Sequence, residues 1–351
     1  MSTSPRDDTA FDGEGDLRTD VRIAIELALD EILDSGERRE LTRVEEEKLT
    51  HFAIRDLDLE LTYSWYLAGV STVASANPDT RSRMHAGPGF GALKAEQPVD
   101  DHIKELQNYF ASEEFFSGYT LRDVWFTDKF EFLRDYYGAL APEKYRELYI
   151  HSLDLREQLW NLTELLETGR KNASLSDFGG GSSSGLLDQS TENEFRYAVS
   201  DFHMDLAGID ELTWLKKDVV RGTDVFERVY AKLTRLDSLS LEQKMLLDEL
   251  HDYFYAYVWK YPALAISAET ASGPNAEALN RRRLIELDGF DERLAAETEM
   301  LTEQSRQLGL LPGVDEPLSN DLDKSGYLHS ILKPRRTSPG AYRTIFLPRI
   351  R

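Results

Sequence analysis

A polar break near the middle of the chain sets the first constraint on its fold. The stretch Ser174–Thr191 contains the run GGGSSSG at positions 179–185. Such a run has almost no apolar surface to bury, so nothing offsets the entropy that is lost when it is ordered. We therefore expect a flexible, solvent-exposed connector between two folded halves, with an rms span of about 25 Å.

Apolar side chains recur at helical spacing on both sides of this break. Between Val21 and Leu33 they appear every four residues, which places them on one face of a helix. A Ser or Thr followed three residues later by Glu or Gln can cap a helix start. Such capping boxes predict helix starts at Thr42, Thr191 and Ser240. The pattern predicts an all-α fold made of two helical bundle halves.

Three further segments are predicted to be helical. The aromatic segment Leu57–Val73 is predicted to be a buried helix. The helix from Ser240 is expected to reach about Tyr261, because Pro262 permits a kink or a stop there. A last helix over Asn275–Leu308 should bend or break near Gly289.

These observations give a five-part organisation. We expect a disordered tail (1–16), an N-terminal helical domain (17–173), the Gly/Ser linker (174–191), a C-terminal helical domain (192–310) and a basic, mostly irregular tail (311–351).

The charge balance points to a salty environment. The chain has 64 acidic and 41 basic residues, giving a formal net charge of -23, and it has no Cys. At 1 M ionic strength the Debye length is only about 3 Å, so surface carboxylates repel one another little and still keep a protein soluble. We interpret the chain as a halophile protein, haloarchaeal by composition; an ordinary acidic bacterial protein is the alternative.

No membrane or export signal is expected. The start, Met1–Gly15, is polar, and no apolar run approaches 18 residues. The absence of Cys excludes disulfides, thiolate catalysis and Cys-ligated zinc. We expect a cytoplasmic protein.

A basic segment at the C-terminal end contrasts with the acidic body. Residues 324–351 contain no Asp or Glu. Their basic side chains, the candidate contact residues, are Lys324, Lys333, Arg335, Arg336, Arg343, Arg349 and Arg351. The segment could contact nucleic acid or an acidic partner, or fold back with its apolar residues in a groove of the body. Because salt weakens phosphate contacts steeply, we favour protein contact or packing over nucleic acid.

Carboxylate and His residues at helical spacing raise the question of a metal site. The pairs are Glu47 with His51, Glu147 with His151, and Asp248 with His251. A di-iron bundle needs two Glu-x-x-His units and two further Glu on inward faces, which this set does not supply. In so acidic a chain we interpret the pairs as surface pairs, and we expect no cofactor.

Other candidate sites have weak patterns. The Gly-rich loop at 87–91 fits neither phosphate-binding motif and is interpreted as a plain loop. No GxSxG motif supports a nucleophilic Ser. The aromatic run Tyr253–Tyr261 could stack bases, but a helix that is apolar nearly all round is more typical of a buried element.

One short segment resembles a known family. Lys48-Leu49, Phe52-Ala53, Trp65-Tyr66 and Gly69 follow the order of residues in the N-terminal part of Panacea-type antitoxin domains. Val70 stands where that pattern has Pro, and the resemblance covers only Leu41–Gly69. It implies a helical toxin-neutralising or phage-defence interaction module, and it carries over no functional residues. The chain as a whole also resembles uncharacterised haloarchaeal helical proteins.

The leading hypothesis is a non-enzymatic interaction or regulatory protein that acts through an unknown protein partner. No catalytic constellation supports an enzyme, and the oligomeric state stays open. A nucleic-acid-binding regulator, using the basic tail and Arg281–Arg283, is the alternative. A helical metalloenzyme is the second alternative.

The nucleic-acid alternative makes a direct prediction. Deleting residues 324–351 should abolish DNA or RNA binding in a mobility-shift assay at molar KCl, because the deletion removes the basic segment. A full-length protein that binds neither nucleic acid at that salt would contradict the alternative.

Overall fold

The computed structural model describes residues 11, 13–73, 100–168, 189–236 and 238–312. Helices dominate this part of the chain, which confirms the predicted all-α class, and one β-hairpin interrupts them. Positions 174–188 of the predicted linker lie outside the described residues. None of the described helices has an apolar stretch long enough to cross a bilayer.

Helices and one hairpin make up the described residues before the break. In chain order they are α1 (Glu14–Ile32), α2 (Arg43–Leu57), β1 (Tyr63–Tyr66), β2 (Gly69–Thr72), α3 (Asp101–Ser112), α4 (Leu121–Phe126), α5 (Lys129–Leu140), the 3-10 turn η3 (Glu143–Tyr145) and α6 (Arg146–Thr168).

The described elements after the break are longer on average. They are α7 (Gln189–Gly208), the 3-10 helix η5 (Asp210–Leu215), α8 (Lys216–Thr234), α9 (Leu241–Tyr253), the π-helical turn η6 (Phe254–Val258), α10 (Lys260–Glu269), α11 (Ala276–Leu287) and α12 (Phe290–Gln307).

Two of the three predicted capping boxes are present. The Thr42 hydroxyl accepts from the backbone N–H of Glu45 at 3.3 Å, and Ser240 accepts from Gln243 at 3.2 Å. The third prediction is wrong, because α7 already begins at Gln189 and Thr191 lies inside its first turn. The first helix also begins earlier than predicted: α1 starts at Glu14, inside the segment 1–16 that was expected to be a tail.

The helix predicted over Leu57–Val73 is wrong. Its centre forms the antiparallel pair β1–β2, with Tyr63 opposite Thr72 and Tyr66 opposite Gly69. Gly69 has φ +89°, and a Cβ placed there would lie 3.0 Å from the Tyr137 ring. A side chain at this turn would therefore meet both backbone strain and a packed ring.

Three helix boundaries are set by single residues. The Asp128 carboxylate caps α5 by accepting from the backbone N–H of Phe130 at 2.8 Å, so α4 and α5 are separate helices. Pro262 does not stop the helix. It lies in the first turn of α10, where a backbone N–H needs no helical partner. The predicted break at Gly289 is confirmed, with φ +65° between α11 and α12.

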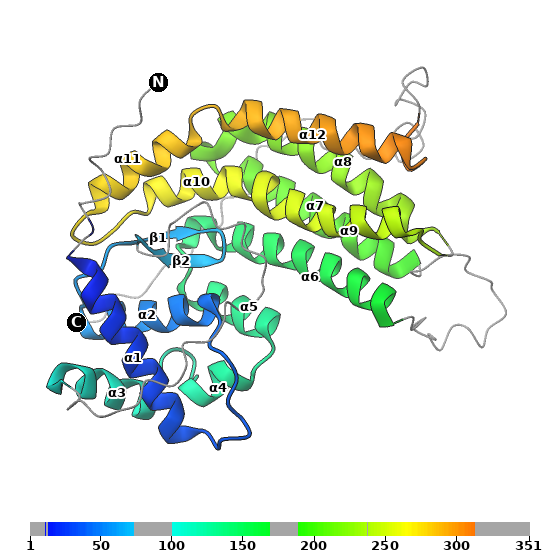
Figure 1. Cartoon of the computed structure of the whole chain (residues 1–351). Helices are drawn as coiled ribbons and strands as arrows, with labels where there is room; N and C mark the ends of the chain where they lie inside the picture. Colours follow the sequence, from blue (N-terminus) through cyan, green and yellow to red (C-terminus); the bar gives the residue numbers. More distant parts are fainter. Residues whose placement is uncertain (1–10, 12, 74–99, 169–188, 237, 313–351) are drawn as a thin grey trace, which may run out of the picture.

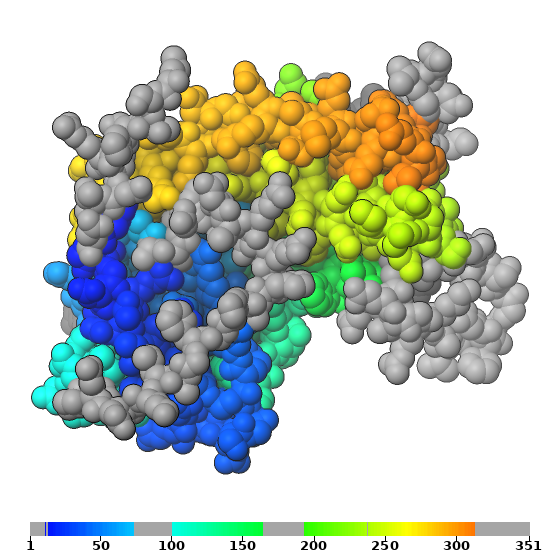
Figure 2. Space-filling view, viewed as in Figure 1, coloured from blue at the N-terminus to red at the C-terminus, as the bar shows by residue number. Residues whose placement is uncertain are grey.

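The hairpin lies at the centre of the molecule. Figure 1 shows it between α10 and α11 above and α2 below, with α6 to its right. The space-filling view shows the gold and orange atoms of α11 and α12 along the upper edge and the blue and cyan atoms of α1 and α3 below (Figure 2). Elements from both halves of the chain therefore surround one short hairpin.

Three buried side chains donate hydrogen bonds to the backbone of the hairpin. The Trp259 indole N–H donates to the Leu67 carbonyl at 2.7 Å, and the Tyr149 hydroxyl donates to the Tyr66 carbonyl at 2.8 Å. The Lys48 ammonium donates to the Val70 carbonyl at 2.8 Å. These donors come from η6–α10, α6 and α2, so each helix is fixed to the same few backbone atoms.

The opposite edge of the hairpin binds the connection between α10 and α11. Tyr63 and Ser272 exchange two backbone hydrogen bonds, of 3.0 and 2.9 Å. Gly273 follows with φ +96°, and a Cβ there would lie only 2.5 Å from the Leu61 carbonyl oxygen. Only Gly permits this close approach.

Glu14 connects the first helix to the same region. Its carboxylate accepts from the Thr62 backbone N–H and hydroxyl, both at 2.6 Å, and from the Asn275 side-chain amide at 2.8 Å. The carboxylate is buried, and these three donors replace the water that it loses.

Buried side chains from both halves form one continuous cluster in the described residues. Trp259 contacts Tyr149 edge-on with ring centroids 5.1 Å apart, and it contacts Phe202 at 6.2 Å. The core is therefore shared between the segments on either side of the break.

Substituting Trp259 tests the contribution of the hairpin contacts. Trp259→Phe should lower the free energy of unfolding by about 1–3 kcal/mol, because it leaves the Leu67 carbonyl without its donor. Trp214→Phe, at an exposed Trp, should change it by less than about 0.5 kcal/mol. Chemical denaturation at constant salt measures both free energies. Equal effects of the two substitutions would contradict the stabilising role of the Trp259 hydrogen bond.

Candidate functional site

The basic residues predicted to contact a partner or nucleic acid lie outside the described residues. These are Lys324, Lys333, Arg335, Arg336, Arg343, Arg349 and Arg351. The Gly-rich loop at 87–91 also lies outside them.

The Arg281–Arg283 run does not form the exposed basic patch that the nucleic-acid alternative invoked. Arg283 is buried, donates to the Ser267 hydroxyl at 2.9 Å and pairs with Glu286 at 3.1 Å. Its guanidinium lies 4.1 Å from the centre of the Tyr66 ring. Arg282 pairs with the same Glu286. Arg283 therefore attaches α11 to the hairpin, and Arg281 is the exposed member of the run.

In the pairs Glu47–His51 and Glu147–His151, the His side chain bonds a residue outside the pair. His51 is buried and shares a 2.7 Å hydrogen bond with the Tyr136 hydroxyl, while Glu47 pairs with Arg43 at 3.1 Å. Burial, with the nearby charge of Lys48, lowers the pKa of His51 to about 3. No group of three or more metal-ligand side chains occurs among the residues that the structure describes.

The aromatic run Tyr253–Tyr261 is mainly a core element. Tyr253, Phe254, Trp259 and Tyr261 are buried, as the sequence interpretation favoured. No continuous stacking surface remains for bases on this helix.

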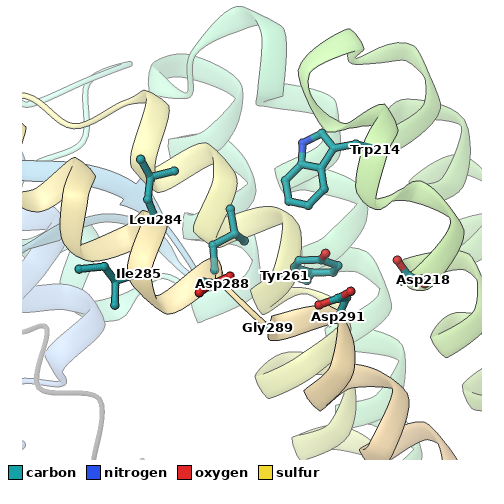
Figure 3. A pocket seen from close by; sticks show the side chains of 9 residues that line it. Trp214, Asp218, Tyr261, Leu284, Ile285, Asp288, Gly289 and Asp291 are labelled. Atoms are coloured by element: carbon teal, nitrogen blue, oxygen red, sulfur yellow. The ribbon is translucent and has the colours of Figure 1, made fainter. Parts of the chain in front are cut away.

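A groove on the upper face is an open site in the described part of the chain. It has a volume of about 640 Å³ and lies between η5, α8, α10 and the junction of α11 with α12. Figure 3 shows Trp214 facing Tyr261, with Leu284 and Ile285 on one side and Asp218 and Asp291 on the other.

The groove is lined by unusually exposed apolar side chains. Trp214 is 56% exposed, Leu284 51% and Ile285 68%. Large apolar groups that gather on a surface mark interaction sites more often than scattered ones do. The apolar lining is therefore the chemical feature that could hold a partner.

A rigid aromatic base supports this lining. Trp214 meets Tyr261 edge-on, with ring centroids 5.7 Å apart, and Tyr261 stacks on Phe290 at 5.2 Å. Tyr261 and Phe290 belong to the core, so the exposed indole is held by a fixed surface. The left-handed Gly289 turns the chain between α11 and α12 and thereby leaves the groove open at that junction.

The rim of the groove is acidic. Asp218, Asp288 and Asp291 line it, and its lining contains no basic side chain. None of the three makes an ion pair with another described residue. Burial, together with the charges of Asp291 and Asp218, raises the pKa of Tyr261 to about 12. The site thus combines apolar contact area with negative potential.

A family model describes nearly the whole chain. The domain of unknown function DUF8098 matches residues 7–332, which includes both halves, the break and the first part of the basic segment. The chain belongs to the DUF8098 family. No curated protein and no solved structure matches it. The DUF8098 match supports treating the two halves and the residues between them as parts of one unit.

Sequence reasoning did not find the groove of this DUF8098 protein. Leu284 and Ile285 directly follow Arg281–Arg283, which drew attention to charge. The adjacent pair Leu284-Ile285 was a usable signal of an exposed apolar surface on this helix. Arg283 is buried on the inner side of α11, and the two aliphatic residues that follow it lie on its exposed side.

The His151–Asp205 pair between α6 and α7 gives this DUF8098 chain a testable pH response. Hydrogen bonding to Asp205 at 2.5 Å raises the pKa of His151 above 6.5. Protonated His151 therefore stabilises the fold at low pH, and that contribution is lost as pH rises through the raised pKa. Asp205→Asn should lower this pKa and reduce the loss of stability that accompanies the rise of pH through it.

An NMR titration of the imidazole signals would measure the pKa, with the exposed His102 as an internal reference. An unchanged pKa for His151 in Asp205→Asn would contradict the assignment.

Proposed function

We propose that the protein is a non-enzymatic interaction protein whose apolar groove holds a basic amphipathic segment, namely residues 324–351 of this chain. The observation that carries the proposal is the pairing of exposed Trp214, Leu284 and Ile285 with an unpaired acidic rim. A partner protein with a segment of the same chemistry would compete for the groove, so that occupancy regulates the contact.

The apolar contact suits the chemistry of the segment. Leu328, Ile331 and Leu332 follow the spacing i, i+3, i+4, which would place them on one face of a bound helix. Amphipathic helices bind grooves through anchors of this kind. Apolar contacts also persist at high salt, where exposed charge pairs are screened.

Charge complementarity favours the same occupant. Residues 324–351 have seven basic side chains and no acidic ones, and the groove has three carboxylates on its rim. The groove therefore offers this segment apolar contact and opposite charge at one place.

Chain length allows the segment to reach the groove of its own molecule. The groove lies at the start of α12, and this helix of 18 residues is about 27 Å long. Leu310 and Leu311 are buried beyond its other end. Residues 313–323 can span up to about 36 Å, which is enough to return along α12.

The wider role follows from composition and resemblance. An acidic, Cys-free chain fits the cytoplasm of a halophile, and the likeness of Leu41–Gly69 to Panacea-type antitoxin domains supports an interaction role. A regulated groove is the property that such a protein would need in order to bind and release a partner.

Zero-length cross-linking provides the direct test. Carbodiimide treatment of the full chain at molar KCl should join Lys324 or Lys333 to Asp218, Asp288 or Asp291. Asp101, a fully exposed carboxylate on α3, serves as the control. Mass spectrometry of mixed isotope-labelled and unlabelled protein separates contacts within one molecule from contacts between two copies. Cross-links to Asp101 as abundant as those to the groove would contradict the proposal.

Variants of the groove sharpen this test. Trp214→Ser combined with Ile285→Ser should weaken docking by about 2 kcal/mol, or about 30-fold, because a Trp anchor carries much of the energy at such contacts. The cross-links to the rim should then fall to the control level. Met300→Ser, at an equally exposed apolar residue on α12, should leave them unchanged.

Nucleic-acid binding through the basic segment is the second candidate. The supporting observation is the concentration of seven basic side chains between Lys324 and Arg351. DNA or RNA would compete with the groove for this segment and would reduce the cross-links, whereas a protein-contact role predicts no such effect.

A further inference from the structure

Arg156 is a buried cation without a counter-ion. It lies in the middle of α6, and only 4% of its surface is exposed. Its Nε atom has no hydrogen-bond partner, and it makes no ion pair with a carboxylate of the described residues. A buried charge without a counter-ion is unfavourable, so an anion bound at this position would be stabilising.

The described contact of Arg156 is an aromatic ring. Its guanidinium carbon lies 4.4 Å from the centre of the Tyr255 ring. Stacking on a ring face stabilises the cation but leaves its N–H donors directed outward around the edge. Arg156 is therefore oriented and still has donors to offer.

A local helix distortion places Tyr255 at this position. Tyr255 belongs to η6, where Trp259 N–H donates to the Phe254 carbonyl at 2.8 Å, five residues back. Single π-helical turns of this kind are rare and are frequent at functional sites. This observation is independent of the burial of Arg156.

Charged groups of both signs lie around Arg156. Lys129, from α5, is close enough that burial and the charge of Arg156 lower its pKa to about 8, against the opposing charges of Glu45 and Asp128. The same two effects lower the pKa of His251 to about 4, so that ring is neutral. Arg43 and Glu47 act on Tyr255 from α2 and pair with each other. Asp252 opposes the lowering at His251, and none of these carboxylates pairs with Arg156 itself, so its own charge is left without a counter-ion among the described residues.

We propose that Arg156, stacked on Tyr255 between α6 and η6, is a binding site for a phosphate-type oxyanion. A guanidinium matches two oxygens of such a group with parallel hydrogen bonds. The burial of Arg156 favours the free ion over the phosphate of a larger molecule.

The location separates this site from the groove. The groove is lined from η5, α8, α10, α11 and α12, and none of its lining residues belongs to α5, α6 or η6. The oxyanion site thus does not depend on the function proposed for the groove.

Calorimetric titration of the full chain with inorganic phosphate tests the proposal. At constant ionic strength we expect saturable binding of one ion per chain. Phenyl phosphate, which carries the same group on a bulky ring, should bind more weakly; stronger binding would assign the site to a phosphate ester. No saturable binding of either would overturn the proposal, since an adventitious surface contact does not saturate at one ion per chain.

Two variants and one control locate the binding. Arg156→Gln should weaken phosphate binding at least about tenfold, because it removes the charged donors. Arg156→Lys keeps the charge but lacks the planar donor pair, so its affinity for phosphate should fall several-fold. This variant provides the test if Arg156→Gln does not fold. Arg134→Gln, on α5 and paired with Asp154 and Glu157, should bind as the parent does. Equal losses in Arg134→Gln, or none in Arg156→Lys, would overturn the assignment to Arg156.

Discussion

Buried backbone carbonyls of the β1–β2 hairpin are the groups on which the rest of the structure depends. A turn usually lies at the surface, where water satisfies its carbonyls. In this protein the turn is enclosed, so the carbonyls of Tyr66, Leu67 and Val70 need protein donors. Tyr149, Trp259 and Lys48 supply them from three different helices. Each donor has an apolar body that belongs to the core, so one residue supplies both packing and a directed hydrogen bond.

This arrangement explains how a chain with a long polar break has a shared core. Lys48 and Tyr149 precede the break and Trp259 follows it, yet all three end at neighbouring backbone atoms. Burial lowers the pKa of Lys48 to about 8, which is the electrostatic cost of placing an ammonium group there. The groove and the oxyanion site both use elements after the break, and their positions depend on α10 and η6, the segment that Trp259 anchors.

The sequence predicted most helices well and the central β1–β2 hairpin poorly. Helices with one apolar face and a capping residue, such as α2 and α9, were predicted because their signals are local. The hairpin was missed because β2 is buried on both faces, which removes the alternation that reveals a strand. The Tyr-Ser-Trp-Tyr segment, the β-branched residues around Val70 and the turn at Gly69 were usable evidence for strands. Lys48 could not have been placed from sequence, because a fully buried Lys is exceptional and its partner is a backbone atom.

The account of the centre is tested most directly by native-state hydrogen exchange. If the hairpin unites both halves, the backbone amides of Tyr63 and Val73 and the Trp259 indole N–H should exchange with the free energy of global unfolding, together with core amides of α6 and α10. Val73 N–H donates to the Thr62 carbonyl and Tyr63 N–H to that of Ser272, so both report directly on the hairpin and its edge. Exchange of the hairpin or of either half at a clearly lower free energy would contradict the account, because it would show that the segments on the two sides of the break open independently.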